Sequence, residues 1–373
     1  AREHRVGRKH VARAIARQDA AIQLRSGNAS ARLSDEQRDA IAHITGPERI
    51  AAVVGIAGAG KSTMLAAAHE AWEAAGYHVH GAALAGKAAE ALEESAGIAS
   101  RTLASWERSW ANGASTLGKG DVLVIDEAGM IGSRQFARFI LEAEQRGAKI
   151  VAVGDPEQLQ PIGAGASFRA VADGIGFAHL EEVRRQREEW QREATRAFAT
   201  HRTKDGLDAY HKAGAIQFEE SGAAARAAIV RDVLAHMEER PDQSRIVLAH
   251  RRADVRQLND AIRAARQVRD ALGGEMTFQT ADGPRAFADG DRIVFLQNDR
   301  LGEIKVKNGM LATVERVADG TIVARIDGRN DAVTVPLATY GAIDHGYATT
   351  IHKAQGATVD RAFVLASTSM DRH

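Results

Sequence analysis

The chain has 373 residues, of which 45% are hydrophobic and 26% are charged, a composition typical of a globular protein with two or three domains. Its formal net charge is zero, so any contact with nucleic acid must come from local basic clusters. The absence of cysteine excludes a disulfide scaffold and a thiolate metal site. No apolar run reaches membrane-spanning length, and we expect a cytoplasmic protein without a membrane span. Because the chain starts at Ala1 and shows no signal-peptide pattern, we expect a fragment of a longer polypeptide.

Residues 1–25 carry seven Arg or Lys side chains against two acidic ones, and Val11, Ile15 and Ile22 recur at helical spacing. This pattern predicts a basic amphipathic helix, which residues 26–28 then break. Charge runs are usually solvated faces, so a linker helix over residues 1–29 is favoured over a contact with nucleic acid.

Residues 55–62 read Gly-Ile-Ala-Gly-Ala-Gly-Lys-Ser and match the phosphate-loop pattern G-x-x-x-x-G-K-[ST] at every fixed position. An apolar run at 50–54 predicts the strand before the loop, and residues 63–75 predict the helix after it. In such a loop backbone N–H groups converge on the phosphates, Lys61 reaches the β and γ phosphates, and the Ser62 hydroxyl is a ligand for Mg²⁺. A glycine-rich turn of structural use alone would not require Lys-Ser, so the pattern predicts a nucleotide site.

Upstream of this loop, Ser34 can cap a helix whose first turn holds Gln37. The amide of Gln37 can hydrogen-bond to an adenine edge, whereas an isolated helical glutamine is more often exposed surface. Its position before the phosphate loop favours the adenine contact.

Two further apolar runs end in turns that carry polar side chains. Residues 122–125 lead into Asp126 and Glu127, and residues 149–153 lead into a Gly-Asp-Pro-Glu-Gln turn that contains Gln158. Asp126 can hold Mg²⁺, Glu127 can orient and deprotonate an attacking water, and Gln158 can sense the γ-phosphate. Because strands and helices alternate along this half, we expect a parallel sheet. His78 and His80 share one strand face, but no third ligand is visible nearby, which makes a metal site there a minor alternative.

The second half begins as another α/β unit, with helical patterns around 190–198, 229–237 and 253–269 and a strand at 245–249. Short alternating runs separated by Gly, Asn and Asp then predict a small β-barrel, with strands at 292–296, 310–317, 322–326 and 332–335. Residues 348–351 and 362–366 return to α/β strands.

Together these motifs resemble a superfamily one DNA helicase of the RecD-like branch. Motifs I, II and III of the branch match residues 55–63, 126–130 and 154–161, and motifs IV and V match residues 180–187 and 347–360. Within the branch, residues 181–203 and 369–373 are most similar to the helicase region of Ti-type conjugative transfer relaxases, the TraA or MobA/MobL group.

The resemblance implies an α/β fold with two RecA-like P-loop NTPase domains, each with a parallel sheet, and a small SH3-like β-barrel inserted in the second. The implied boundaries are a basic linker helix at 1–29, a first RecA-like domain at 30–182, a second at 183–283 and 341–373, and the insert at 284–340.

The resemblance also implies ATP and Mg²⁺ as cofactors and assigns roles to residues. Gln37 would contact the adenine, while Lys61, Ser62, Asp126, Glu127 and Gln158 would surround the phosphates and Mg²⁺. Further nucleotide contacts would come from Gly55, Gly58, Gly60, Thr63 and Gly356. Arg185 would be an arginine finger, although a surface arginine is the alternative because Arg184 and Arg187 compete for the role. Single-stranded DNA would contact Lys87, Thr102, His352 and Lys353, but Ala85 stands where the branch often has a threonine, which puts one DNA contact in doubt.

The implied function is ATP-driven 5′→3′ movement along single-stranded DNA in a conjugative plasmid-transfer relaxase, with other conjugation or repair proteins as further partners. A RecD-type repair helicase, similar to the exonuclease V alpha subunit, shares every motif and is one alternative. An ATP-binding DNA clamp without turnover is another, and a P-loop kinase would have no use for residues 154–161 or 347–356. The family pattern places a further motif VI arginine beyond residue 373, so we expect the chain by itself to bind nucleotide but to be a poor ATPase.

Overall fold

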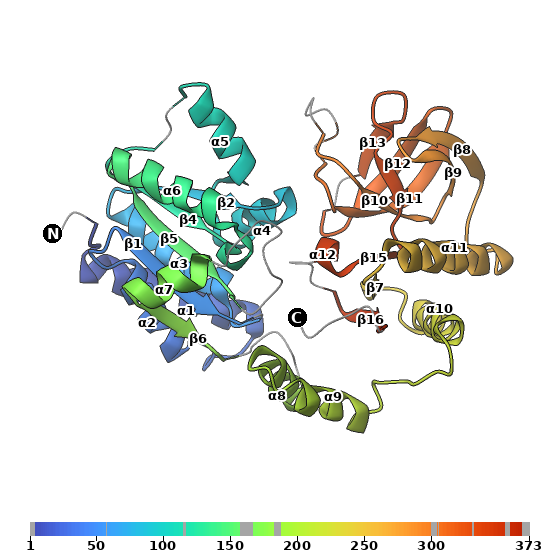
Figure 1. The fold of residues 1–373 in the computed structure, drawn as a ribbon, viewed down its shortest axis with the longest axis horizontal. Coiled ribbons are helices and arrows are strands. Elements are labelled where there is room, and N and C mark those ends of the chain that lie inside the picture. The colour runs from blue at the N-terminus through green and yellow to red at the C-terminus, as the bar shows by residue number, and fades with distance from the viewer. Residues whose placement is uncertain are drawn as a thin grey trace. The chain divides into compact units, whose positions relative to one another are not determined.

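The computed structural model describes residues 4–56, 58–114, 117–156, 167–182, 188–299, 304, 306–329, 332–354 and 359–367. The chain divides into two units, Ala1–Gln217 and Phe218–Arg372, whose elements are labelled in Figure 1. Among the described residues no helix is both long enough and apolar enough to cross a membrane.

The first unit is built on a six-stranded sheet in which every neighbouring pair is parallel. In spatial order its strands are β3 (Ser100–Thr102), β2 (His78–Ala83), β4 (Asp121–Ile125), β5 (Lys149–Gly154), β1 (Ile50–Gly55) and β6 (Phe177–Leu180). The prediction of a parallel sheet is therefore confirmed. The two edge strands were not predicted, because β3 has only three residues, Ser-Arg-Thr, and β6 lacks an apolar run.

Helices cover both faces of this sheet, as a parallel sheet requires. Successive residues of β1 separate into two cores, since Ala51 and Val53 belong to one apolar cluster and Ala52 and Val54 to the other. The first core includes α2 (Asp35–Ile44), α3 (Lys61–Ala74) and α4 (Gly86–Ala96), and the second includes α5 (Leu103–Ala111), α6 (Ser133–Arg146) and α7 (Ser167–Ile175).

The basic helix α1 (Arg8–Ser26) is part of this unit and not a solvated linker. Ala14 is fully buried, and Val11, Ile15 and Ile22 pack against the first core. Two side chains on its polar face make contacts as well: Arg17 pairs with Glu70 of α3 at 2.6 Å, and Asp19 accepts from the Leu33 N–H at 2.8 Å. The apolar positions at helical spacing thus bury against α3, while the basic side chains near the start of the helix stay exposed.

The division between the units falls after Gln217, beyond the boundary at residue 182 that the sequence suggested. Helices α8 (Glu189–Ala199) and α9 (Thr203–Lys212) belong to the first unit. Ala199, at the end of α8, packs against the first core. No local sequence pattern predicts this contact.

The second unit contains a three-stranded parallel sheet with β7 (Arg245–Ala249) between β15 (Ala348–Thr350) and β16 (Arg361–Leu365). Helices α10 (Gly222–Glu239) and α11 (Arg252–Val268) pack on it through Val233, Leu258 and Ile262. The short helix α12 (Ile351–Ala354) follows β15 directly. The α/β elements expected in this half are therefore present.

Between α11 and β15 the second unit holds an antiparallel sheet of five strands. Its order is β13 (Ala332–Pro336), β12 (Thr321–Ile326), β11 (Leu311–Ala318), β10 (Arg292–Phe295) and β14 (Ile343–His345), so the four predicted strands are confirmed. A hairpin of β8 (Glu275–Thr280) and β9 (Gly283–Ala288) precedes the sheet and was not predicted. Phe278 and Phe287 of the hairpin share one apolar cluster with Phe295 and Ile322 of the sheet, so the antiparallel region begins before residue 284.

Candidate nucleotide-binding site

The candidate site lies at one edge of the first sheet. Parallel pairing sets Val54 beside Gly154, Ile125 beside Ala152 and Ala82 beside Ile125. The carboxyl ends of β1, β2, β4 and β5 therefore meet at the same edge, which is where open α/β sheets bind their ligands. The phosphate loop follows β1 there, and Asp126 and Glu127 follow β4.

Two glycines of the phosphate loop adopt backbone conformations that favour glycine over other residues. Gly58 and Gly60 have φ values of 81° and 76°, in the left-handed region that side chains disfavour. Gly60 also caps α3, and a Cβ atom there would lie 2.3 Å from Nε2 of Gln37. Ser62 and Thr63 lie half-buried in the first turn of α3, whose N-terminal N–H groups favour an anion.

Lys61 folds back over the loop. Its Nζ donates to the carbonyl oxygens of Gly55 at 2.7 Å and Ile56 at 3.2 Å. The ammonium group thus lies at the mouth of the loop, within reach of a phosphate that would compete with these carbonyls.

Gln37 is buried and not an exposed helical glutamine, with only 2% of its surface accessible. It forms a capping box with Ser34: Oε1 accepts from the Ser34 N–H at 2.9 Å, and the Gln37 N–H donates to the Ser34 hydroxyl. Nε2 donates to the carbonyl oxygen of Gly60 at 3.1 Å. The amide therefore ties α2 to the phosphate loop, and an adenine contact would replace one of these bonds.

The two carboxylates after β4 occupy unusual positions. The Glu127 N–H donates to Oδ1 of Asp126 at 2.9 Å, and Glu127 has a φ of 55°, which is rare for a side chain of this size. Burial raises the pKa of Asp126. Burial, reinforced by the Asp126 charge and opposed by Lys61, raises the pKa of Glu127 to about 7. A carboxyl with such a pKa can exchange protons near neutral pH.

The turn after β4 packs directly on the turn after β5, and two glycines allow it. A Cβ on Gly129 would lie 2.3 Å from the carbonyl oxygen of Asp155, and a Cβ on Gly154 would lie 2.8 Å from the Gly129 nitrogen. This packing places Asp155, which is 8% exposed, beside the turn that carries Glu127. The packing role of these glycines was missed, and the signal was their position beside the strand-end carboxylates: Gly129 lies two residues after Glu127, and Gly154 directly precedes Asp155.

Two predicted DNA contacts lie at the same sheet edge. Lys87 is in the first turn of α4, and Thr102 caps α5, where its hydroxyl accepts from the Ser105 N–H at 3.2 Å. The pairing of Ala83 with Thr102 brings the ends of β2 and β3 together. These residues therefore lie at the sheet edge that also holds the phosphate loop.

Other predicted site residues fall elsewhere. Gln158, Arg185 and Gly356 lie outside the described residues, and so does the side chain of His352. Lys353 is exposed on α12 of the second unit. Among the residues that the structure describes, no group of three or more His, Asp or Glu side chains could hold a metal, and His78 and His80 form no such site.

The family model described as "AAA domain" matches residues 32–221, which is more than half of the chain and includes the whole candidate site. The chain belongs to this AAA domain family. The match begins just before α2 and leaves out α1, although α1 packs on the same core.

This AAA domain chain is 53% identical over 347 residues to the conjugal transfer protein TraA of Rhizobium radiobacter, covering 92% of the chain and 31% of that protein. It is 28% identical over 337 residues to the ATP-dependent RecD2 DNA helicase of Deinococcus radiodurans, covering 87% of the chain and 44% of that protein. The predicted resemblance to TraA and RecD-like proteins is confirmed. The chain spans about a third of the length of the TraA relatives.

Among solved structures, the Pif1 helicase from Bacteroides in complex with ADP-AlF3 and single-stranded DNA matches with a TM-score of 0.57 and 19% identity. The match covers 90% of this chain and 87% of that one. At this identity the match shows a similarity of fold.

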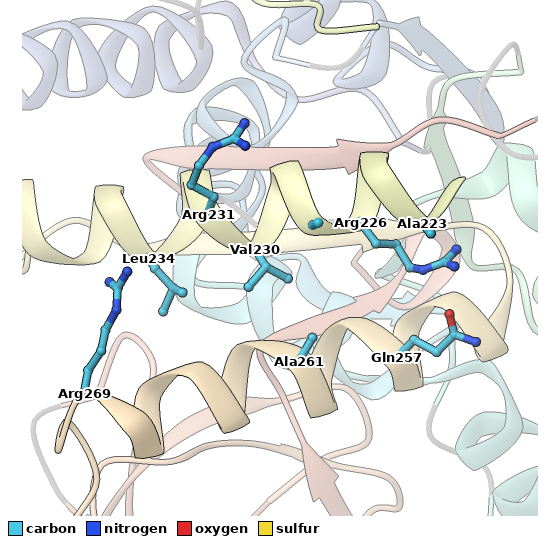
Figure 2. Close-up of a pocket in the computed structure, with 9 residues that line it drawn as sticks. Ala223, Arg226, Val230, Arg231, Leu234, Gln257, Ala261 and Arg269 are labelled. Carbon is cyan, nitrogen blue, oxygen red and sulfur yellow. The ribbon is translucent and has the colours of Figure 1, made fainter. Parts of the chain in front are cut away.

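A separate hollow of 570 Å³ lies in the second unit, between α10 and α11. Figure 2 shows Val230 and Leu234 of α10 above Ala261 of α11, with arginines around them. Each arginine of the lining has an acidic partner: Arg226 pairs with Asp254, Arg231 with Asp232 and Arg269 with Glu238. Because these charges are compensated, the hollow is not a second candidate for phosphate binding.

Proposed function

We propose that this chain is the ATP-dependent DNA translocase and helicase region of a conjugative plasmid-transfer relaxase. The observation that carries the proposal is the meeting, at one sheet edge, of the phosphate loop after β1 with the carboxylate pair after β4. The similarity to TraA over 92% of the chain supports the conjugative role.

The residues at the edge divide the work of ATP hydrolysis. The loop N–H groups and Lys61 would bind the phosphates, with Lys61 exchanging its carbonyl partners for phosphate oxygens. The Ser62 hydroxyl and the Asp126 carboxylate are hard oxygen donors that suit Mg²⁺, which when bound neutralises phosphate charge. Glu127 would take a proton from the attacking water, and Gln37, Gln158, Arg185 and Gly356 keep the roles that the resemblance implies.

Movement on DNA would use both units. Lys87 and Thr102 in the first, with His352 and Lys353 in the second, would hold the backbone of single-stranded DNA, and the parallel sheet of the second unit would be the second RecA-like domain. The antiparallel sheet would be the SH3-like insert that guards the strand path. The Pif1 structure carries single-stranded DNA and an ADP complex, which supports these ligands, and the RecD-like resemblance supports the 5′→3′ direction.

The decisive experiment measures ATP hydrolysis by the full-length protein with and without single-stranded DNA, together with unwinding of a tailed duplex. DNA-stimulated hydrolysis with unwinding supports the proposal. Nucleotide and DNA binding without turnover would favour the clamp. DNA-stimulated hydrolysis and unwinding by a full-length protein that neither nicks nor transfers plasmid DNA would favour the RecD-type repair helicase.

We expect kcat/KM for MgATP to rise with pH through about 7 and to level off above it, because Glu127 must be ionised to accept a proton. The pKa of Glu127 in the free protein is raised to about 7, so its base form is lost as pH falls. At one pH unit below that pKa the parameter should be about tenfold under its plateau, since kcat/KM reports the ionisation of the free enzyme. The residual activity of Glu127→Gln should lack this step, and a wild-type profile that is flat between pH 6 and 8 would remove Glu127 as the base.

Lys353→Ala should weaken the binding of single-stranded DNA about equally across sequences and flatten its salt dependence, because a phosphate contact is lost. The slope of log K against log salt should fall by about 0.7 for one contact to a single strand. Fluorescence anisotropy over a salt series measures both quantities. The matched control is Arg240→Ala, an exposed cation that precedes β7 and so lies at the opposite edge of the parallel sheet from α12. An unchanged slope in Lys353→Ala, or an equal change in the control, would take Lys353 out of the strand path.

A further inference from the structure

Asp291 is a fully buried carboxylate at the turn between β9 and β10, with 0% of its surface exposed. Arg263 of α11 donates Nε to both of its oxygens, at 3.2 and 3.0 Å. The Ala288 N–H donates to Oδ2 at 2.7 Å, and the Tyr347 hydroxyl donates to Oδ1 at 2.6 Å. Its charge is therefore met by one arginine and two further donors, which offset the cost of removing a carboxylate from water.

A second arginine of α11 completes this cluster. Arg266 donates Nη1 to the Tyr347 hydroxyl at 2.9 Å and to the carbonyl oxygen of Gly290 at 2.7 Å. Arg263 also reaches the carboxylate of Glu275 in β8 at 2.5 Å. The donors and acceptors thus come from α11, from the hairpin, from the turn before β10 and from the residue before β15.

The chain at Tyr347 connects the two sheets of the second unit. β14 ends at His345 within the antiparallel sheet, and β15 begins at Ala348 within the parallel sheet, so only Gly346 and Tyr347 lie between them. Gly346 is held tightly, because a Cβ there would lie 2.6 Å from the Ile293 carbonyl carbon and oxygen. β15 then leads without interruption into α12, which carries Lys353.

Asn259, also of α11, holds the start of β15. Its Nδ2 donates to the Ala348 carbonyl at 3.1 Å, and its Oδ1 accepts from the Ala348 N–H at 2.8 Å. Together with the bonds at Tyr347, these contacts set the direction in which β15 and α12 leave the antiparallel sheet.

We infer that Tyr347 and Asp291 are positioning residues that lock the antiparallel sheet to β15 and α12, so that the sheet and Lys353 meet a DNA backbone as one rigid element. The DNA-binding part of this inference rests on the proposed function. The structural part rests on the hydrogen bonds that join Asp291, Tyr347, Arg263 and Arg266. Apolar side chains in place of this network would bury the same area. Directional hydrogen bonds to a buried carboxylate, however, favour one orientation of the two sheets over other, similar orientations.

The first test is hydrogen exchange of the backbone amides at residues 348–354 in the full-length protein, comparing Tyr347→Phe with the wild type. The variant keeps the ring and removes a hydroxyl that donates to Asp291 and accepts from Arg266. These amides should therefore exchange at least about two- to tenfold faster, the factor that corresponds to one of these two hydrogen bonds.

The matched control for this test is Tyr340→Phe. Tyr340 is also buried, at 8% exposed against 4% for Tyr347, and its hydroxyl also donates one bond, to the Gln297 carbonyl within the antiparallel region. Unchanged exchange at 348–354 in Tyr347→Phe, or the same increase in Tyr340→Phe, would overturn the inference.

The second test is a double-mutant cycle on the affinity for single-stranded oligothymidylate. Tyr347→Phe should weaken binding by about two- to tenfold in the wild type and by much less in Lys353→Ala, because the hydroxyl acts through Lys353. Additive effects would overturn the link to Lys353. If exchange rises as expected but neither Lys353→Ala nor Tyr347→Phe alters DNA binding, the lock stands and the proposed DNA contact of α12 fails.

Discussion

Lys61→Ala should reduce DNA-stimulated ATP hydrolysis by about 10²- to 10³-fold or more, the effect of removing one group that stabilises charge in a transition state. Lys61 begins α3, and its ammonium group already lies against the carbonyl oxygens of Gly55 and Ile56 at the loop mouth. Only that side chain combines a positive charge with this position in the phosphate loop, so a neutral substitute leaves the γ-phosphate charge uncompensated. The measurement is steady-state ATP turnover by the full-length protein with saturating single-stranded DNA.

The fold should survive this change, because Lys61 is half-buried at the start of α3 and alanine favours a helix. The charge-matched control is Lys119→Ala, an exposed lysine in the turn before β4 and so at the opposite edge of the sheet. Unaltered melting temperature in both variants with loss of turnover in Lys61→Ala alone is the expected pattern. Wild-type turnover in Lys61→Ala would mean that the loop does not bind the transferred phosphoryl group.

Glu127→Gln should bind MgATP as the wild type does but hydrolyse it about 10²- to 10⁴-fold more slowly, the range that general acid–base catalysis supplies. The substitution preserves the shape of the side chain and removes a carboxyl whose pKa is raised to about 7, so the variant lacks a group that can take a proton from water. Asp126 remains to hold the metal. Equilibrium binding of a fluorescent ATP analogue and single-turnover hydrolysis separate the two effects.

The neighbouring carboxylate provides the comparison. Asp126→Asn should lose Mg²⁺-dependent nucleotide affinity, which Glu127→Gln should keep, since an amide is a weaker ligand than a carboxylate for a hard cation. If Glu127→Gln loses nucleotide binding to the same extent as Asp126→Asn, the two residues have been given the wrong roles.

Much of the candidate site could be predicted because its signals are local. The Gly-x-x-x-x-Gly-Lys-Ser pattern directly follows an apolar run, and the two carboxylates directly follow the apolar run of β4. Each of these two signals is contained within a few consecutive residues. Because strands and helices alternate, the strands are parallel, and their carboxyl ends meet at one edge of the sheet. The same reasoning could not place Gln37, whose buried amide donates to the carbonyl of Gly60, 23 residues away.

The predictions for Gln158, Arg185 and Gly356 remain predictions, since these residues lie outside the described ranges. For Thr102 the structure adds a competing demand, because the hydroxyl already caps α5. A DNA phosphate would therefore have to accept the hydroxyl hydrogen of Thr102 while its oxygen keeps the Ser105 N–H.

By itself the sequence determined the phosphate loop, the strand-end carboxylates, the parallel sheet of the first unit and the four short strands of the antiparallel sheet, because hydrophobic periodicity and turn residues act over neighbouring positions. Only the tertiary structure decided that α1 buries its apolar stripe on α3 and that the β8–β9 hairpin joins the antiparallel core. It also decided that Tyr347 meets Asp291, 56 residues earlier. These contacts depend on which surfaces remain to be buried once the elements exist, and that balance of burial and hydrogen bonding is set by the whole unit and not by any stretch of it.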